Sequence, residues 1–270
     1  MKTNIGRAST GSLRGTAEWA SKVPLATAAF WLAKIIATTV GEVGGNLVSM
    51  DSGLGYLQAT AVLGTLFVAL AAVQVVVRRF HPAVYWSTIV ASTTAGTTLA
   101  DYVTRSIGLG YAGGSILLFA LVLASLVSWW WTIGRVAADD IAGRRAEVFY
   151  WVTITFSQTL GTALGDWFAD SAGFGYSGSA LIFGSALLLL LLLHYRRAVN
   201  GVILFWAAFI LTRPLGAVVG NFFDKPVDHG GLALGRPTLT FVMLCLMIAS
   251  LILFPTRAKL LRDMKPSPVN

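Results

Sequence analysis

The sequence predicts an all-α membrane protein that crosses the bilayer eight times, and three observations support this prediction. Only 12% of the 270 residues are charged, whereas 56% are hydrophobic; soluble domains usually carry about 25% charged residues. Apolar stretches of about 20 residues, the length that an α-helix needs to cross the hydrocarbon layer, recur along the chain. These stretches are continuously apolar and do not alternate, so they favour helices over the strands of a closed barrel.

The eight predicted spans are separated by short polar loops. They cover residues 24–49, 55–77, 84–104, 110–134, 148–169, 176–195, 201–222 and 236–254. Polar, basic segments precede the first span and follow the last one. We therefore expect an N-terminal tail at residues 1–22, a single transmembrane domain at 23–255 and a C-terminal tail at 256–270.

The basic residues lie mostly on one side of the predicted membrane. Most of the 20 Lys and Arg residues fall in the two tails and in the loops after the even-numbered spans, whereas the opposite loops hold only Arg105, Lys225 and Arg236. Because cytoplasmic loops are enriched in Lys and Arg, both termini are predicted to be cytoplasmic. The first apolar stretch contains Glu42 and is too long for a signal peptide, so cleavage is not expected.

A fourfold internal repeat organises the transmembrane domain. Each repeat opens with an aromatic residue followed by a Trp, and ten residues after this Trp stands a glycine. Fifteen residues after it stands Asn or Asp. Three repeats then continue into a Gly-Leu-Gly-Tyr or Gly-Phe-Gly-Tyr loop, whereas the fourth reads Asp-His-Gly-Gly at 228–231. Each repeat contains two spans, so the repeats are predicted to be parallel helical hairpins, at about 25–80, 83–135, 148–198 and 201–255.

This pattern resembles a bacterial membrane-protein family of unknown function that consists of four tandem two-helix repeats, each with a Trp. The same family is described as uncharacterised membrane-anchored proteins. The resemblance extends over about residues 25–255 and implies a multi-pass protein of the bacterial cytoplasmic (inner) membrane. It implies no activity, so the function has to be sought in the residues themselves.

The acidic and basic residues well inside the spans all lie on the first helix of a repeat. They are Lys34, Glu42, Asp101, Asp166 and Arg213. A charge in the hydrocarbon centre costs at least about 2.5 kcal/mol, so such groups face the protein interior or a watery cavity. We therefore expect the odd-numbered helices to form an inner ring and the even-numbered helices to face the lipid.

Positions eight, eleven and fifteen after each Trp lie near one face of these first helices, and in the first three repeats all of them are polar. In the fourth repeat Pro214 and Ala217 occupy the first two of these positions, and Arg213 stands just before them. We expect this face to form a substrate or ion pathway near the membrane centre. The predicted pathway residues are Thr39, Glu42, Asn46, Thr94, Asp101, Thr159, Asp166, Arg213 and Asn221. The alternative is a self-satisfied polar core in which Arg213 or Lys34 neutralises a carboxylate.

Small residues ten and fourteen positions after each Trp give every first helix the spacing that lets helix backbones approach closely. The predicted packing glycines are Gly41, Gly45, Gly96, Gly161, Gly165, Gly216 and Gly220.

The repeat tryptophans are expected to anchor the protein at the cytoplasmic interface of the membrane. They are Trp31, Trp86, Trp151 and Trp206.

These features predict a secondary transporter or channel for a small cationic solute, with a proton as a candidate coupling ion. Oxygen ligands suit a hard cation, although the sequence leaves the identity of any metal open. The alternative function is a non-transporting sensor, scaffold or assembly subunit. No catalytic or nucleotide-binding motif is visible, so neither an enzyme nor a cofactor is expected. The expected partners are the lipid bilayer and a small solute but not nucleic acid, and homo-oligomerisation is left open.

Overall fold

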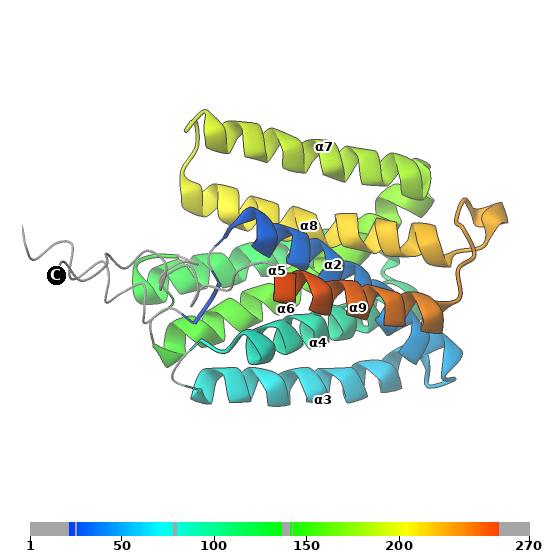
Figure 1. Ribbon diagram of the computed structural model, residues 1–270, viewed down its shortest axis with the longest axis horizontal. Coiled ribbons are helices and arrows are strands. Elements are labelled where there is room, and N and C mark those ends of the chain that lie inside the picture. The colour runs from blue at the N-terminus through cyan, green and yellow to red at the C-terminus, as the bar shows by residue number, and fades with distance from the viewer. Residues whose placement is uncertain (1–21, 25, 78–79, 137–140, 142, 254–270) are drawn as a thin grey trace, which may run out of the picture.

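The computed structural model describes residues 22–24, 26–77, 80–136, 141 and 143–253. These residues form eight α-helices and no strand, with one helix in each predicted span. The helices run roughly side by side along the long axis of the molecule (Figure 1). The two predicted tails lie outside the described residues, apart from Lys22.

The helices alternate with short loops. Their bounds are α2 (Ala28–Asn46), α3 (Gly55–Val76), α4 (Pro82–Asp101), α5 (Gly110–Ile133), α6 (Arg144–Asp166), α7 (Gly175–Tyr195), α8 (Gly201–Asp224) and α9 (Arg236–Leu253). Among them, α3, α5, α7, α8 and α9 are long and apolar enough to cross a membrane. The other three helices are less apolar because they carry many of the polar residues of the repeats.

Local chemistry explains where several helices begin and end. Thr27 caps α2, because its hydroxyl accepts a hydrogen bond from the Phe30 backbone N–H at 3.2 Å. Asn200 caps α8 in the same way. Pro82 occupies the first turn of α4, where its missing N–H costs nothing. The helix α5 ends at Ile133, and the following Gly134 takes the left-handed conformation common at helix ends.

In three of the four repeats the first helix ends in a single π-helical turn. These turns are η1 (Leu47–Asp51), η2 (Tyr102–Ser106) and η3 (Trp167–Ser171). The glycine-rich loop follows, and both of its glycines have positive φ angles, such as +76° at Gly53 and +70° at Gly55. Side chains rarely adopt this backbone conformation, which explains why the loop motif requires two glycines. The fourth repeat lacks both features, and α8 continues to Asp224.

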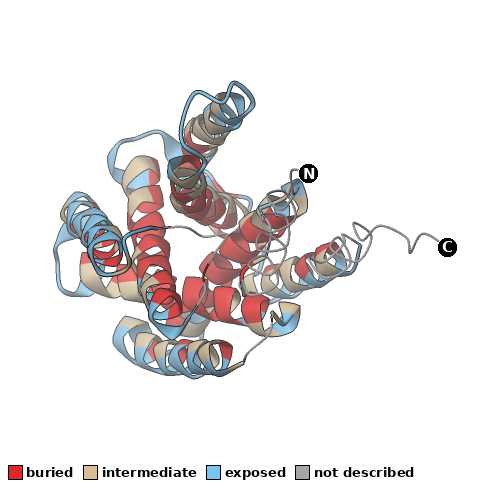
Figure 2. Ribbon diagram, turned by 90° about the vertical axis from the view of Figure 1, so that its left-hand side faces the viewer, coloured by how far each residue is buried: buried red, intermediate tan, exposed pale blue. Residues whose placement is uncertain are grey.

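The first helices of the four repeats pack on one another in a closed cycle. α2 contacts α4, α4 contacts α6, α6 contacts α8, and α8 returns to α2. Figure 2 shows that buried residues are concentrated on these helices. The cycle follows the order of the repeats, so every repeat meets the next one through an equivalent interface.

A glycine ten residues after each repeat Trp allows this close contact. A Cβ atom added to Gly41 would lie 2.0 Å from Thr93 Oγ1, and one added to Gly216 would lie 2.1 Å from Thr38 Oγ1. In every case the glycine meets the residue seven positions after the Trp of the next helix. The four pairs are Gly41–Thr93, Gly96–Gln158, Gly161–Arg213 and Gly216–Thr38.

The small residues one turn further along make similar contacts. An added Cβ would lie 2.7 Å from the next helix at Gly45, 3.1 Å at Gly220 and 3.3 Å at Gly165. Such distances leave little or no space for a larger side chain. All seven glycines that the sequence singled out therefore lie where one first helix touches another.

The second helix of each repeat packs mainly against the first helix of the following repeat. α3 lies on α4, α5 on α6 and α7 on α8, and α9 closes the arrangement on α2. The two helices of a repeat are joined by a short loop, as predicted, but they pack mainly on other helices and little on each other. The glycines allow the first helices to pack closely on each other. Each second helix packs its apolar side chains on the first helix of the neighbouring repeat. Large apolar side chains of the second helices remain exposed, such as Leu181 at 73%.

The repeat tryptophans lie in an aromatic layer at one end of the cycle. The Tyr85 and Tyr150 hydroxyl oxygens are 2.8 Å apart, and the two rings pack against Trp151 and Trp206. Trp86, Trp151 and Trp206 are each no more than 5% exposed. These three indoles are therefore fixed by contacts within the protein, which differs from the predicted position at the lipid interface.

Candidate functional site

Buried polar side chains form three layers between α2, α4, α6 and α8. The layers contain the residues seven, eleven and fifteen positions after each repeat Trp, and every one of these residues is at most 2% exposed. Residues four apart share one face of an α-helix, so each helix contributes to all three layers. The layers are Thr38, Thr93, Gln158 and Arg213; Glu42, Thr97, Thr162 and Ala217; and Asn46, Asp101, Asp166 and Asn221.

An ion pair joins the first two layers. Both Nη atoms of Arg213 lie 3.2 Å from Glu42 Oε2. Arg213 Nη2 also donates to the hydroxyls of Thr97 at 2.6 Å and Thr162 at 2.5 Å. Each hydroxyl in turn donates to Glu42 Oε2, at 3.4 and 3.2 Å. One residue from each of the four first helices therefore takes part in this charge-assisted network.

The third layer connects Glu42 with a second carboxylate. The Asn221 amide donates to Glu42 Oε1 at 3.3 Å and to Asp166 Oδ1 at 3.2 Å. The Asn46 amide donates to Asn221 Oδ1 at 3.3 Å. Because one amide bridges the two carboxylates, a change at Glu42 can alter the hydrogen bonds of Asp166.

Arg105 covers the remaining carboxylates at the end of the cycle opposite the aromatic layer. Its Nε lies 2.9 Å from Asp101 Oδ1, and its Nη2 lies 3.2 Å from Asp166 Oδ2. Its side chain is 31% exposed, whereas those of the two aspartates are at most 3% exposed. The Tyr56 hydroxyl accepts a further hydrogen bond from Arg105 Nη1. Arg105 thus separates a buried acidic site from the surface.

The structure brings together most, but not all, of the predicted pathway residues. Glu42, Asn46, Asp101, Asp166, Arg213 and Asn221 belong to the cluster. Thr39, Thr94 and Thr159 do not, and each donates only to a carbonyl of its own helix. These threonines lie eight positions after the Trp, which is one residue, or about 100°, from the layer residues at position seven.

Sequence reasoning also missed Arg105, which it placed in a loop. The signal was present, because Arg105 follows Asp101 by four residues and such pairs meet on a helix.

A second ion cluster was missed as well: Arg236 Nε lies 2.8 Å from Asp224 Oδ1, and Arg236 also pairs with Asp51. This contact joins the fourth repeat to the first and has no counterpart in the repeat pattern.

Lys34 lies in the next layer toward the aromatic end and is fully buried. Its Nζ has no hydrogen-bond partner among the described residues, and it lies 4.1 Å from the centroid of the Phe209 ring. The sequence left open whether Lys34 or Arg213 neutralises a carboxylate. The structure places Arg213 against Glu42 and leaves Lys34 without an acidic partner.

Replacement of Lys34 by methionine is expected to raise the stability of the protein by about 1 kcal/mol or more, because it removes an unsatisfied buried donor. Thermal unfolding in detergent measures the change. Lys22→Met is the matched control. It should lower stability by roughly 1–2 kcal/mol, because Lys22 Nζ lies 2.7 Å from Glu147 Oε1. A loss at Lys34 as large as that at Lys22 would contradict the expectation.

No group of three or more His, Cys, Asp or Glu side chains is placed to hold a metal ion within the part of the chain that the structure describes. The charged groups of the cluster instead pair with each other. Eight helices, several of them long and apolar enough to cross a bilayer, enclose this cluster. The protein is thus a multi-pass helical membrane protein.

The chain belongs to the family described as Repeat of Unknown Function (DUF347), whose model matches residues 29–80, 84–134, 149–200 and 204–257. The four matches confirm the resemblance to a four-repeat family that the repeated sequence indicated. No curated protein and no solved structure matches the chain.

Proposed function

We propose that this protein is a secondary transporter for a small cation in the bacterial cytoplasmic membrane. Its first helices would enclose the path, its second helices would face lipid, and both termini would be cytoplasmic. The observation that carries the proposal is the cluster itself, in which Glu42, Asp101 and Asp166 come together in one buried network. Buried carboxylates inside a membrane domain are typical of ion and proton pathways.

The energetics of the cluster support a functional role. A buried ion pair adds little to stability compared with well-packed apolar residues of similar size. Three of the four helices supply an apolar residue to the next layer, where Ile89, Ile154 and Phe209 are fully buried together with Lys34. Apolar side chains are therefore compatible with the interior of this ring. The presence of charges there is better explained by a ligand than by stability.

The charge of the cluster suggests which cations would bind. Within the cluster, the three carboxylates and the two guanidinium groups that pair with them leave one negative charge, and Lys34 lies outside this group in the next layer. A single monovalent cation or a proton would balance this charge. Displacement of the partly exposed Arg105 would open Asp101 and Asp166 to the outer side, and Arg213 would remain as a tethered positive charge beside Glu42.

A flux assay in proteoliposomes tests this proposal, with Na⁺ and H⁺ as the probes. The double variant Asp101→Asn, Asp166→Asn should lower the wild-type flux about tenfold or more, because it removes two charged ligands. Asp228→Asn, whose side chain is exposed in the last loop, is the control and should leave flux unchanged. Unchanged flux in the double variant, or no flux in the wild type, would contradict the proposal.

The second candidate is a non-transporting scaffold or assembly subunit with a structural polar core. The observation that favours it is the pairing of all three carboxylates with neighbouring groups. This candidate expects no wild-type flux of either ion. It also expects the double aspartate variant to be less stable than the wild type, which thermal unfolding in detergent would measure.

A further inference from the structure

The guanidinium group of Arg105 occupies a site at the end of the cycle opposite the aromatic layer. Two buried carboxylates contact it, with Asp101 Oδ1 2.9 Å from Nε and Asp166 Oδ2 3.2 Å from Nη2. The ring centroids of Tyr56 and Tyr111 lie 5.9 and 5.6 Å from its central carbon. Aromatic faces and carboxylate oxygens together are the groups that bind a flat, weakly hydrated cation.

Both tyrosines belong to the glycine-rich loop motif, to which the buried network assigns no role. Tyr56 and Tyr111 are the second residues of α3 and α5, and each directly follows a glycine with a positive φ angle. The equivalent Tyr176 of the third repeat instead donates to Asp170 Oδ1 at 3.1 Å. Three repeats thus build the site, because the first and second provide the rings and the second and third provide the carboxylates.

Arg105 does not satisfy all of the acceptors that surround it. Asp101 Oδ1 accepts no hydrogen bond from the described residues, although Asp101 is 1% exposed and Arg105 Nε lies 2.9 Å away. Arg105 follows Asp101 by only four residues, which limits the directions from which its N–H groups can approach. A buried acceptor without a hydrogen bond is costly. A free guanidinium ion has no such tether and carries N–H groups on every nitrogen, so it fits these acceptors better than Arg105 does.

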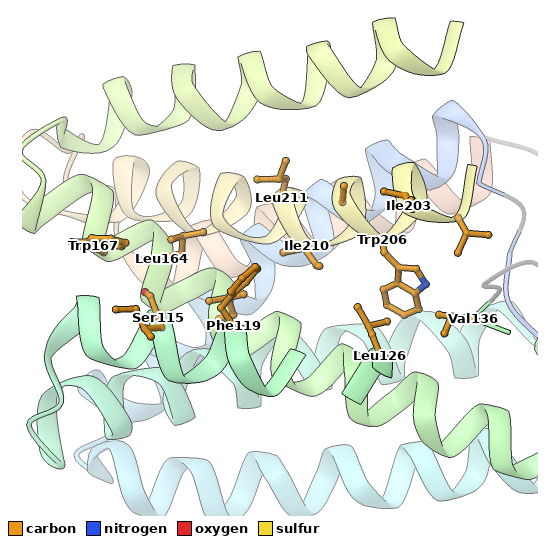
Figure 3. Close-up of a pocket in the computed structure, with 14 residues that line it drawn as sticks. Ser115, Phe119, Leu126, Val136, Leu164, Trp167, Ile203, Trp206, Ile210 and Leu211 are labelled. Atoms are coloured by element: carbon orange, nitrogen blue, oxygen red, sulfur yellow. The ribbon is translucent and has the colours of Figure 1, made fainter. Parts of the chain in front are cut away.

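The site can be reached from the surface, because only Arg105 covers the two carboxylates. Its side chain is 31% exposed, so it can swing away without disturbing the helices. By contrast, the groove between α5, α6 and α8 offers nothing to a cation (Figure 3). It has a volume of about 700 Å³, but none of the residues that line it is charged.

We propose that this site binds a small guanidinium or amidinium compound, which displaces the Arg105 side chain and lies between the two carboxylates and the rings of Tyr56 and Tyr111. Arg105 is then a tethered competitor that keeps Asp101 and Asp166 paired when no ligand is bound. A strongly hydrated ion such as Na⁺ fits less well, because aromatic faces do not replace its oxygen ligands. That the ligand is the transported cation rests on the proposed function, whereas its binding does not.

Equilibrium binding of radiolabelled guanidinium to the full-length protein in detergent tests the site. The wild type should bind it saturably at millimolar concentrations. Arg105→Ala should bind at least about tenfold more tightly, because a tethered group competes at an effective concentration of millimolar order. No saturable binding by the wild type, or no gain in affinity in folded Arg105→Ala, would overturn the proposal. If Arg105→Ala is unstable, guanidinium but not Na⁺ should raise its unfolding temperature, and equal effects of the two ions would also overturn it.

Further substitutions in the Arg105→Ala protein identify the groups that hold the ligand. Asp166→Asn should weaken guanidinium binding about tenfold, through the loss of a charge-assisted hydrogen bond. Tyr111→Leu should weaken it by about twofold to fivefold, through the loss of one aromatic face. The matched controls are Asp228→Asn and Tyr195→Leu, whose side chains are exposed away from the site. Equal affinities for the site variants and their controls would contradict the proposed site.

This experiment and the flux assay can fail separately. Guanidinium binding without any Na⁺ or H⁺ flux would support the site and contradict transport. Flux that depends on Asp101 and Asp166, in a protein that does not bind guanidinium, would support transport and overturn the site. Methylguanidinium should compete with the label, and competition by Na⁺ at the same concentration would contradict the assigned ligand class.

Discussion

Replacement of Arg213 by methionine is expected to destabilise the folded protein by about 3–5 kcal/mol, because it leaves the Glu42 carboxylate buried without its counter-charge. Arg213 donates to Glu42 through both Nη atoms and also to Thr97 and Thr162. Methionine fills part of the same volume but provides none of these hydrogen bonds. A lysine would restore the charge but not the planar fork of donors, so Arg213→Lys should recover only part of the loss.

Unfolding in detergent, followed by denaturant or by temperature, measures this effect. The informative comparison is the double variant Glu42→Met, Arg213→Met, in which both charges are absent. It should be more stable than Arg213→Met alone, since removing both members of a buried pair is far less costly than removing one. The single variant Glu42→Met completes the comparison. If the stability losses of Glu42→Met and Arg213→Met simply add up to the loss of the double variant, Glu42 and Arg213 do not form the coupled pair that the structure shows.

Replacement of Gly41 by alanine is expected to cost about 1–3 kcal/mol or more, because the new methyl group would overlap the next helix. Its carbon would lie 2.0 Å from Thr93 Oγ1 and 2.9 Å from the Thr93 carbonyl carbon. Rotation of the threonine side chain cannot relieve the second contact. The two helices would have to separate, and this separation would disturb the buried network between them.

Gly64→Ala on α3 is the matched control. Nothing lies within 4 Å of a Cβ atom at this position, and alanine is the better helix former by up to about 1 kcal/mol. The control should therefore be neutral or stabilising in the same unfolding experiment. An unfolding temperature for Gly41→Ala at or above that of the wild type would show that the helices do not approach as closely as described.

Much of the fold could be predicted because it depends on local patterns. The length of the apolar stretches predicted where each helix lies, and the repeated spacing after each Trp predicted which residues are equivalent. The ionisable residues within the predicted spans pointed to the first helices, since charges are too costly to face lipid. The same spacing identified glycines such as Gly41 and Gly216, which the structure places in close helix contacts.

One of the three positions that defined the predicted face was wrong by one residue, because the layers contain position seven after the Trp instead of position eight. Positions seven and eight after the Trp are both polar in the first three repeats, where Thr38 is followed by Thr39, Thr93 by Thr94 and Gln158 by Thr159. Adjacent residues differ by about 100° around a helix, and periodicity alone does not show which of them points to the centre. The contact of Thr93 with Gly41 decides the question, and this contact depends on the angle at which two helices meet.

By itself, the sequence determined a four-repeat membrane protein of eight helices, with buried charges on the first helix of each repeat. Only the tertiary structure decided which groups are partners: Arg213 rather than Lys34 for Glu42, and Arg105 for Asp101 and Asp166. It also placed each second helix on the following repeat. The physical reason is the distance along the chain over which each property is determined. Whether a segment forms an apolar helix depends on residues close together in the sequence. Which side chains form ion pairs depends on how helices far apart in the chain pack together.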